Sequence, residues 1–282
     1  MPEGDTVWLA GKRMHASLAG QVLTTSDFRV PQLATTDLSG RRVLEVVPRG
    51  KHLLTRVEGG LTLHTHFRMD GSWHLYDPGV RWTGGAEWQV RVVLTTAERV
   101  AVGYRLPVVE LLTTDREHEA VGHLGPDLLG PDWDEDEALR RLWQEPTREV
   151  GLALLDQELL AGLGNLYRCE VLFLRGLSPW TPVAAVPDLP AVVRLGRRLL
   201  MTNRDRWEQT TTGSLRRGED HWVFERSGRA CRRCGTRVRS AEQGAAPRQR
   251  LTYWCPSCQV GPAPLSPTPR RTRPQGRTSY RP

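Results

Sequence analysis

The spacing of hydrophobic positions divides the chain into an N-terminal part rich in strands and a C-terminal part rich in helices. Val7, Ala10, Met14 and Leu18 recur at helical spacing, which predicts an amphipathic helix over 5–18. Short apolar runs, broken by Gly, Pro and Asp, then predict strands at 43–47, 52–57, 61–65, 73–76, 90–95 and 100–104. These runs lie too close together for crossover helices, so we expect an antiparallel β-sandwich.

A segment rich in Gly and Pro, at 124–138, separates the two parts and ends in acidic residues suited to capping a helix. Beyond it the pattern predicts helices near 135–144, 149–160, 165–175 and 189–201, followed by a loop at 210–220. The fold class is therefore expected to be α+β and multidomain. Its predicted parts are an N-terminal domain at 1–122, a helical domain at 123–222, a cysteine-rich finger at 223–260 and a disordered basic tail at 261–282.

Composition places the chain among folded proteins, since 282 residues with 39% hydrophobic side chains can bury real cores. No segment has the apolar length of a membrane span, and the N-terminus does not resemble a secretory or transit signal. We therefore expect a cytoplasmic, nucleoid-associated protein that is monomeric and has no membrane partner.

The net charge of +7 favours a polyanionic partner, because neutralising phosphates releases counterions. Five of the positive charges are arginines after Pro262, and no acid accompanies them, which leaves about +2 for the rest (7 − 5). Basicity alone therefore does not identify a nucleic-acid enzyme.

Four of the five cysteines form two CxxC pairs separated by twenty residues, Cys231 with Cys234 and Cys255 with Cys258. Two such turns supply four thiolates to one ion, which predicts a single Zn²⁺ site. A closed four-sulfur shell leaves no position for water, so the zinc is expected to be structural. The fifth cysteine, Cys169, lies in an apolar stretch and is predicted to be a buried small side chain.

Two glycines, Gly162 and Gly164, separate the helices predicted at 149–160 and 165–175, and Asn165 begins the second. Such a turn lets the backbone approach a ligand, and a helix N-terminus attracts phosphate. From the chemistry alone, a phosphate-gripping turn and an ordinary packing corner between helices are equally plausible.

Taken together, these pieces resemble the formamidopyrimidine-DNA glycosylase and endonuclease VIII family from position 1 to about 259. The resemblance rests on the opening Pro2-Glu3-Gly4, the Arg49-Gly50-Lys51 corner, a helix-two-turn-helix motif over 155–165 and a zinc finger over 231–258. It implies a bifunctional DNA glycosylase and abasic-site lyase of base excision repair, acting on damaged DNA.

The resemblance also assigns catalytic roles. Once Met1 is removed, Pro2 presents a secondary amine that attacks the anomeric carbon, expels the base and forms an iminium for β/δ-elimination. A terminal amine titrates near pH ~8, so part of it is unprotonated at neutral pH. Glu3 would protonate the opening deoxyribose, and Lys51 would contact the phosphate beside the lesion.

Five further residues are implied to bind DNA. Asn165 and Arg250 would hold phosphates that flank the damaged nucleotide. Met69, with Arg68 and Asp70 beside it, would fill the space left by a flipped base. The alternative for Met69 is a strand end packed in the core.

At several positions the sequence differs from the usual pattern of the family, and these differences bear on the substrate. The segment 104–109 lacks the Arg and Phe typical of formamidopyrimidine enzymes, which favours the endonuclease VIII branch and oxidised pyrimidines. Thr6 replaces the second acid of the family opening, and Asp5 is a neighbouring carboxylate whose direction the sequence does not give. A metal site at His64 and His66 is conceivable, but neutral histidines in the core or facing DNA are the better interpretation.

Two alternatives remain open. One is a purine-preferring glycosylase for 8-oxoguanine or formamidopyrimidine. The other is a non-catalytic protein that binds damaged DNA on the same scaffold, which the presence of Pro2, Glu3 and Lys51 disfavours because binding requires no terminal amine.

Overall fold

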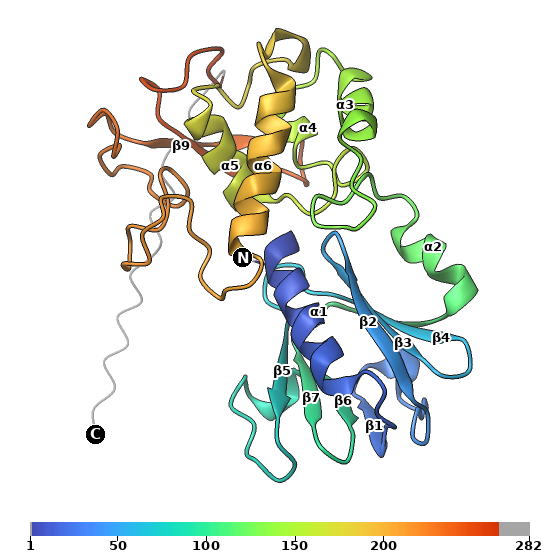
Figure 1. Cartoon of the computed structure of the whole chain (residues 1–282). Helices are drawn as coiled ribbons and strands as arrows, with labels where there is room; N and C mark the ends of the chain where they lie inside the picture. The colour runs from blue at the N-terminus through green and yellow to red at the C-terminus, as the bar shows by residue number, and fades with distance from the viewer. Residues whose placement is uncertain (1, 265–282) are drawn as a thin grey trace, which may run out of the picture.

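The computed structural model describes residues 2–264 and places two halves side by side, an N-terminal β-rich half and a C-terminal helical half (Figure 1). The first half consists of the helix α1 (Gly4–Leu18), the strands β1 (Thr25–Phe28), β2 (Val43–Arg49), β3 (His52–Val57), β4 (Leu61–His66), β5 (Ser72–Tyr76), β6 (Val90–Thr95), β7 (Val100–Tyr104) and β8 (Val108–Thr113), and the short helix α2 (Glu117–Val121). The second half contains the helices α3 (Glu135–Trp143), α4 (Val150–Ala153), α5 (Asn165–Leu174) and α6 (Leu189–Asn203), and the strands β9 (Arg239–Gln243) and β10 (Arg250–Trp254).

The β-rich half is the expected antiparallel sandwich. One four-stranded sheet has the order β1-β6-β7-β5 and the other the order β2-β3-β4-β8. Inward-facing side chains from both sheets meet in one core, which includes Leu53 and Leu63 of one sheet and Val92 and Leu94 of the other. All pairs within these sheets are antiparallel, as the short connections require.

Helix α1 packs on this sandwich and at the same time reaches the other half (Figure 1). Its apolar face buries Val7, Met14 and Leu18 in the sandwich core, as the hydrophobic spacing predicts. Trp8, on another face, packs against the core of the helical half. The first turn of α1 therefore lies at the junction of the two halves.

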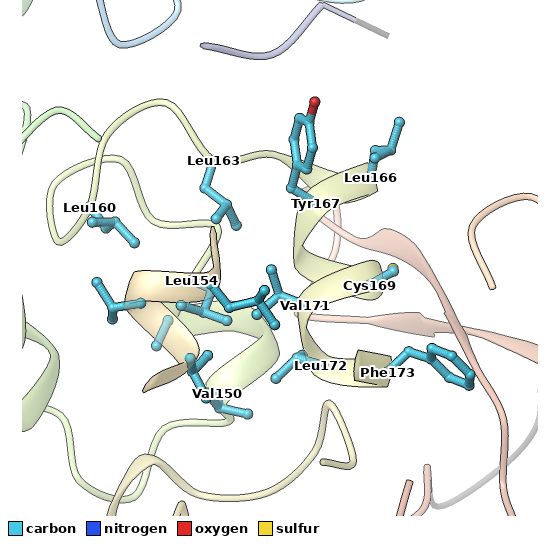
Figure 2. Packing of buried hydrophobic residues seen from close by; sticks show 14 of the residues in the cluster. Val150, Leu154, Leu160, Leu163, Leu166, Tyr167, Cys169, Val171, Leu172 and Phe173 are labelled. Carbon is cyan, nitrogen blue, oxygen red and sulfur yellow. The ribbon is translucent and has the colours of Figure 1, made fainter. Parts of the chain in front are cut away.

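The helical half has its own core, built mainly from α5, α6 and the turns around α4. Figure 2 shows side chains of Leu154, Leu163 and Val171 among the apolar residues that face this interior. Cys169 is fully buried there, which confirms its prediction as a small core side chain. Asp134 caps α3 by accepting a hydrogen bond from the Glu137 amide at 3.0 Å, as the acidic run predicts.

One predicted helix is much shorter than expected. The helix expected over 149–160 ends at Ala153, and the chain continues in turns to the start of α5. The Asp156 carboxylate accepts a hydrogen bond from the Glu158 amide at 3.0 Å, which competes with helix continuation. The prediction of a helix over 154–160 was wrong, and the result is a short helix, two turns and a second helix.

Two strands of the sandwich and one short helix were not predicted. Strand β1 is four residues long and largely exposed, so it lacks a clear alternation. Strand β8 was also not predicted, although it pairs with β4 over its whole length. The short helix α2 was likewise not predicted. The remaining predicted strands and helices agree with the structure to within about two residues at each end, which is the ordinary uncertainty of element boundaries.

Across residues 2–264, none of the helices combines the length and the apolar character that crossing a membrane requires. The prediction of a disordered tail falls almost entirely on 265–282, which lie outside the described residues.

Candidate active site

A cleft of about 840 Å³ lies between the two halves. Side chains from five separate parts of the sequence line it: the N-terminus, the β2–β3 corner, the turn after β4, the segment around α4 and α5, and the β9–β10 hairpin. All of the predicted catalytic and DNA-binding residues except Asp70 are among its lining residues, namely Pro2, Glu3, Lys51, Arg68, Met69, Asn165 and Arg250.

Glu3 is buried at the floor of this cleft. Its carboxylate accepts hydrogen bonds from the Gly164 amide at 2.8 Å and the Leu166 amide at 2.7 Å, at the N-terminus of α5. A Cβ at position 164 would lie 2.5 Å from the Glu3 Cδ, so only glycine permits this approach. Burial is the largest effect on the carboxyl and, against an opposing attraction from Lys51, raises the pKa of Glu3 to about 7. Glu3 can therefore hold or release a proton near neutral pH.

Lys51 is half-buried beside Glu3 and donates a hydrogen bond from Nζ to the Leu163 carbonyl at 2.7 Å. Burial lowers the pKa of the Lys51 ammonium, and the neighbouring Glu3 carboxylate partly offsets that effect. The sequence places this lysine on a corner before a strand, and the structure shows that the helical half fixes its position.

Contacts from the helical half also hold the backbone on either side of Lys51 and Glu3. The Asp127 carboxylate accepts a hydrogen bond from the Gly50 amide at 2.7 Å. The Gly162 carbonyl accepts one from the Gly4 amide at 2.9 Å, and Gly162 itself has a left-handed backbone with a φ of 99°. The geometry of the site therefore depends on the docking of the two halves.

The turn after β4 presents Met69 to the cleft, with 61% of the residue exposed. Arg68 adopts a left-handed backbone, with a φ of 46°, and its amide donates a hydrogen bond to the His66 Nδ1 at 2.9 Å. The alternative in which Met69 packs in the core is wrong. An exposed flexible apolar side chain at the mouth of a cleft can insert into an apolar or stacked ligand.

Asn165 and Arg250 lie across the cleft from that turn. Asn165 donates a hydrogen bond from Nδ2 to the Leu251 carbonyl at 2.9 Å, so the start of α5 is joined to β10. The fully buried Arg168 strengthens this joint by donating to the Asn165 Oδ1 at 2.5 Å and the Thr252 Oγ1 at 2.6 Å. Arg250 is exposed and available to an anionic ligand.

The histidines of β3 and β4 pack against one another: the rings of His52 and His64 are stacked, and those of His52 and His66 meet edge to face. His52 and His64 share a hydrogen bond at 2.8 Å, and the His64 Nδ1 lies 3.0 Å from the Glu110 carboxylate. Burial and neighbouring positive groups lower the pKa of His52 to about 3 and that of His66 to about 4, so both rings are neutral at physiological pH. For His66 this agrees with the interpretation of a neutral histidine.

The four cysteines of the two CxxC pairs gather at one end of the β9–β10 hairpin. Their Sγ atoms all lie within 4.8 Å of one another, and two of the separations are 3.9 Å (Cys231 to Cys258) and 3.5 Å (Cys234 to Cys255). Within residues 2–264 this is the one group of three or more His, Cys, Asp or Glu side chains that lie close enough together to hold a metal ion.

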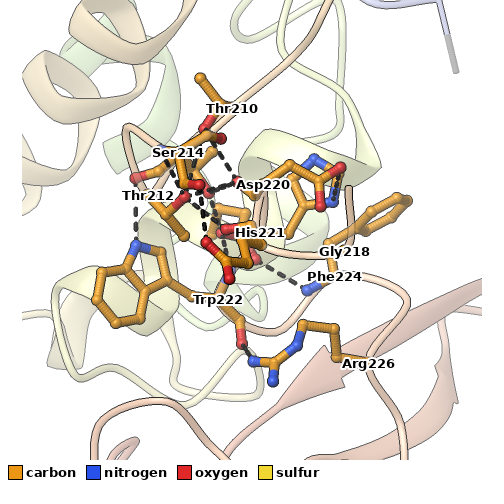
Figure 3. Close-up of polar contacts among 12 residues, drawn as sticks. Thr210, Thr212, Ser214, Gly218, Asp220, His221, Trp222, Phe224 and Arg226 are labelled. Atoms are coloured by element: carbon orange, nitrogen blue, oxygen red, sulfur yellow. Dashed lines mark hydrogen bonds and ion pairs between the residues drawn. The ribbon is translucent and has the colours of Figure 1, made fainter. Parts of the chain in front are cut away.

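The segment from 210 to 224 forms a compact loop beside α5 and α6 (Figure 3). The buried Glu170 of α5 organises one end of it by accepting hydrogen bonds from the amides of Trp222, Val223 and Phe224, each at 2.8 Å, and from the Thr211 hydroxyl. Sequence reasoning did not identify Glu170, because a glutamate within an apolar helix gives no sign of the loop that it will bind.

The sequence matches two family models. That of the formamidopyrimidine-DNA glycosylase N-terminal domain matches residues 1–105, and that of the formamidopyrimidine-DNA glycosylase H2TH domain matches residues 124–189. The second match includes α4, the two turns and α5.

Curated relatives match over nearly the whole chain. A probable endonuclease 8 2 of Streptomyces coelicolor is 59% identical, with 100% of this chain and 99% of that protein covered. A DNA-(apurinic or apyrimidinic site) lyase Nei2 of Mycolicibacterium smegmatis is 44% identical, with 92% and 99% covered, and an endonuclease 8 of Escherichia coli is 33% identical, with 92% and 100% covered.

Solved structures agree in fold. A Lactococcus lactis Fpg in complex with DNA containing an abasic site has a TM-score of 0.75 and 22% identity, with 92% of this chain and all of that chain covered. A structure of MutM in complex with DNA containing carbocyclic 8-oxo-G has a TM-score of 0.75 and 23% identity, with the same coverage.

Proposed function

Because the chain belongs to the formamidopyrimidine-DNA glycosylase and endonuclease 8 family, we propose that it excises oxidised bases from damaged DNA, pyrimidines preferentially, and cleaves the resulting abasic site. The observation that carries the proposal is the convergence of Pro2, Glu3 and Lys51 in one cleft between the two halves. A protein that only binds DNA has no need for a buried acid with a pKa of about 7 beside the N-terminus.

In the proposed reaction, removal of Met1 exposes the secondary amine of Pro2 at the cleft. The amine forms a bond to the anomeric carbon of the damaged nucleotide while the glycosidic bond breaks and the base leaves. Glu3 gives its proton to the ring oxygen as the deoxyribose opens, and loss of the amine proton produces an iminium. The iminium makes the neighbouring C–H groups acidic. Loss of a proton from C2′ expels the 3′ phosphate by β-elimination, and loss of a proton from C4′ then expels the 5′ phosphate by δ-elimination.

Lys51 serves the same reaction by binding phosphate beside the lesion. Burial lowers the pKa of its ammonium, and an approaching phosphate would raise that pKa again by stabilising the charged form that binds it. Asn165 and Arg250 hold further phosphates on the other side of the cleft and position the strand without reading its sequence. Arg68 and Asp70 accompany Met69 on the opposing turn.

The proposed division of labour follows the domains expected from the sequence. The part at 1–122 supplies the catalytic groups, the part at 123–222 grips the strand through the helix-two-turn-helix motif, and the finger at 223–260 adds Arg250. The protein would act as a monomer on chromosomal DNA in the cytoplasm.

Met69 is proposed to fill the stack when the damaged nucleotide leaves the duplex. The variant Met69→Ala is expected to excise a damaged base from duplex DNA about tenfold more slowly, since unstacking costs a few kcal/mol and alanine cannot fill the gap. Single-turnover excision measures the effect. Val80→Ala, which truncates another exposed apolar side chain away from the cleft, is the matched control. Equal rates for Met69→Ala and the control would contradict the role.

The cysteine cluster is proposed to hold one structural Zn²⁺. Tetrahedral Zn–S bonds of about 2.3 Å require sulfur atoms about 3.8 Å apart, close to the separations of 3.5 and 3.9 Å found here. Thiolate ligands from two CxxC turns suit zinc, and a bound zinc would stabilise the hairpin that carries Arg250.

Native mass spectrometry is expected to find one zinc ion per chain, and the variant Cys255→Ser is expected to lose it. Without the metal the hairpin that carries Arg250 loosens. The affinity for abasic-site DNA should then fall by about tenfold or more, because a charged phosphate contact contributes about 1.5 kcal/mol or more. Cys169→Ser, outside the cluster, should keep its zinc. A folded wild-type protein that carries no metal after expression in zinc-containing medium would refute the assignment.

Substrate preference is tested with duplex oligonucleotides that carry thymine glycol, dihydrouracil, 8-oxoguanine or a bare abasic site. The proposal predicts excision of the two pyrimidine lesions, and strand cleavage without added alkali. Faster excision of 8-oxoguanine would support the purine-preferring alternative. Binding to all four without cleavage of any would support a non-catalytic protein.

A further inference from the structure

Asp5 is a second buried carboxylate next to the proposed site, and the reaction described above does not use it. Only 2% of the residue is exposed. Its Oδ1 accepts hydrogen bonds from the Thr6 amide and the Gln209 Nε2, both at 2.8 Å, and its Oδ2 accepts one from the Tyr167 hydroxyl. Every one of these partners is a donor, and such an arrangement favours the ionised carboxylate.

These partners come from different elements. Thr6 belongs to the first turn of α1, Tyr167 to the first turn of α5, and Gln209 to the segment that follows α6. Asp5 is therefore the point at which all three meet, two residues after Glu3. The N-terminus of α5, which binds the Glu3 carboxylate through its amides, is thereby also joined to α1 through Tyr167.

The Asp5 contact is the buried end of a longer seam between α1 and the segment 204–209. Farther along the helix, Trp8 lies under the Arg204 guanidinium, Lys12 pairs with Asp205, and Arg13 lies over Trp207. Lys12 and Asp205 are both more than half exposed on their side chains, so solvent screens that pair. Asp5 is the member of the seam whose charge is shielded from water.

A negative charge at Asp5 acts on Glu3 through the protein interior. Five groups interact electrostatically with Glu3. They come from α1, from the turn between β2 and β3, and from α5, and they are Asp5, Lys51, Tyr167, Arg168 and Cys169. Burial is the main reason that the pKa of Glu3 is raised, Lys51 opposes it, and Asp5 raises it further. Burial raises the pKa of Asp5 as well, while its hydrogen-bond donors act in the opposite direction.

We propose that Asp5 is a positioning residue: its carboxylate fixes the first turn of α1 against α5 and Gln209, and its charge keeps the proton on Glu3 until the sugar ring opens. The inference rests on the proposed function, because it requires Glu3 to act as the acid. Thr6, which replaces the second acid of the family opening, binds Asp5 through its amide and does not supply a carboxylate of its own.

The test is the pH dependence of Asp5→Asn relative to wild type, in single-turnover cleavage of an abasic-site oligonucleotide. Removing the charge lowers the proton affinity of Glu3, so the ratio of variant to wild-type rate should fall as the pH rises. We expect this ratio to fall by about 2.5-fold to fivefold between about pH 6 and about pH 8, which corresponds to a pKa of Glu3 that is lower in the variant by about half a unit to one unit. Because both rates depend on Pro2 in the same way, its titration cancels from the ratio.

Asp205→Asn is the matched control, since it removes an aspartate that also pairs with α1 but is screened, and its ratio to wild type should not change with pH. If Asp5→Asn does not fold, Tyr167→Phe replaces it. Loss of that donor makes the charge on Asp5 harder to hold, so the same but smaller trend is expected.

A loss of rate that is equal at every pH would show a merely structural role and would overturn the inference. This outcome is distinct from failure of the proposed function, in which the wild-type protein itself would not cleave abasic-site DNA at any pH.

Discussion

Replacing Glu3 by glutamine is expected to lower the rate of base excision by about 10²-fold to 10⁴-fold, the contribution typical of a positioned general acid. The substituted side chain would be nearly the same size but would have no proton to give to the ring oxygen. Its amide nitrogen would also face a backbone N–H donor where the carboxylate now accepts from Gly164 or Leu166, which should cost about 1–3 kcal/mol of stability. Single-turnover excision at about 25 °C, below the melting transition of the variant, measures the catalytic part.

The pH profile supplies a second check on Glu3. Since its pKa is raised to about 7, the protonated form is present below that pH and is lost above it. Wild-type excision should therefore lose the contribution of this acid as the pH rises through about 7, whereas Glu3→Gln should lack that dependence. Glu98→Gln, on an exposed turn of the sandwich, should match the wild type at all pH values. Excision by Glu3→Gln at a rate close to wild type would contradict the role of Glu3.

A single additional residue before Pro2 is expected to abolish the activity, with a loss on the order of 10⁴ or more, comparable to the loss of a covalent nucleophile in other enzymes. The extension converts the secondary amine into an amide nitrogen, which has no lone pair available for attack. It leaves every side chain in the cleft unchanged. Strand cleavage of abasic-site DNA measures the activity, and mass spectrometry verifies the N-terminus of each preparation.

Pro2→Gly is the comparison for that variant, because it keeps a free but primary amine at the same place. Partial activity is expected for Pro2→Gly and none for the extended chain. If the extended chain cleaves as well as the wild type, the nucleophile is another group, and Lys51 would be the first to examine because partial burial lowers the pKa of its ammonium.

Local signals were sufficient for much of this fold. Hydrophobic periodicity was enough to predict six strands of the sandwich and the helices α1, α3, α5 and α6. Each of these elements buries apolar side chains at the regular spacing of a strand or a helix. Strand β1 and the turns after α4 were not recoverable in this way. The conformation of β1 depends on its pairing with β6, and that of the turns after α4 depends on the hydrogen bond to the Asp156 side chain. The spacing of apolar residues carries no information about either interaction.

The candidate site was likewise predictable only in part from the sequence. Residue types and spacing pointed to the cysteine cluster, and the resemblance pointed to Pro2, Glu3 and Lys51. Neither could show that Gly162 and Leu163 hold Gly4 and Lys51 through their carbonyl oxygens, because those acceptors belong to the backbone and are common to all residues. The direction of Asp5 was equally hidden, since it depends on Tyr167 and Gln209, far away in the sequence.

The structure suggests why the two halves must act together. Glu3 derives its hydrogen bonds from the N-terminus of α5, and Lys51 is tied to the turn just before it, although both residues belong to the β-rich half. Relative motion of the halves would therefore disturb the acid and the lysine at once. Bound DNA that contacts both sides of the cleft would hold this arrangement in place.

The central claim is that the Pro2 amine becomes covalently attached to the sugar, and trapping with sodium borohydride tests it most directly. Borohydride reduces the iminium to a stable amine, so protein incubated with abasic-site DNA should form a crosslink, and peptide mapping should place the sugar on the N-terminal proline. Protein that is confirmed to lack Met1 and that yields no crosslink, or a crosslink located at Lys51, would contradict the account.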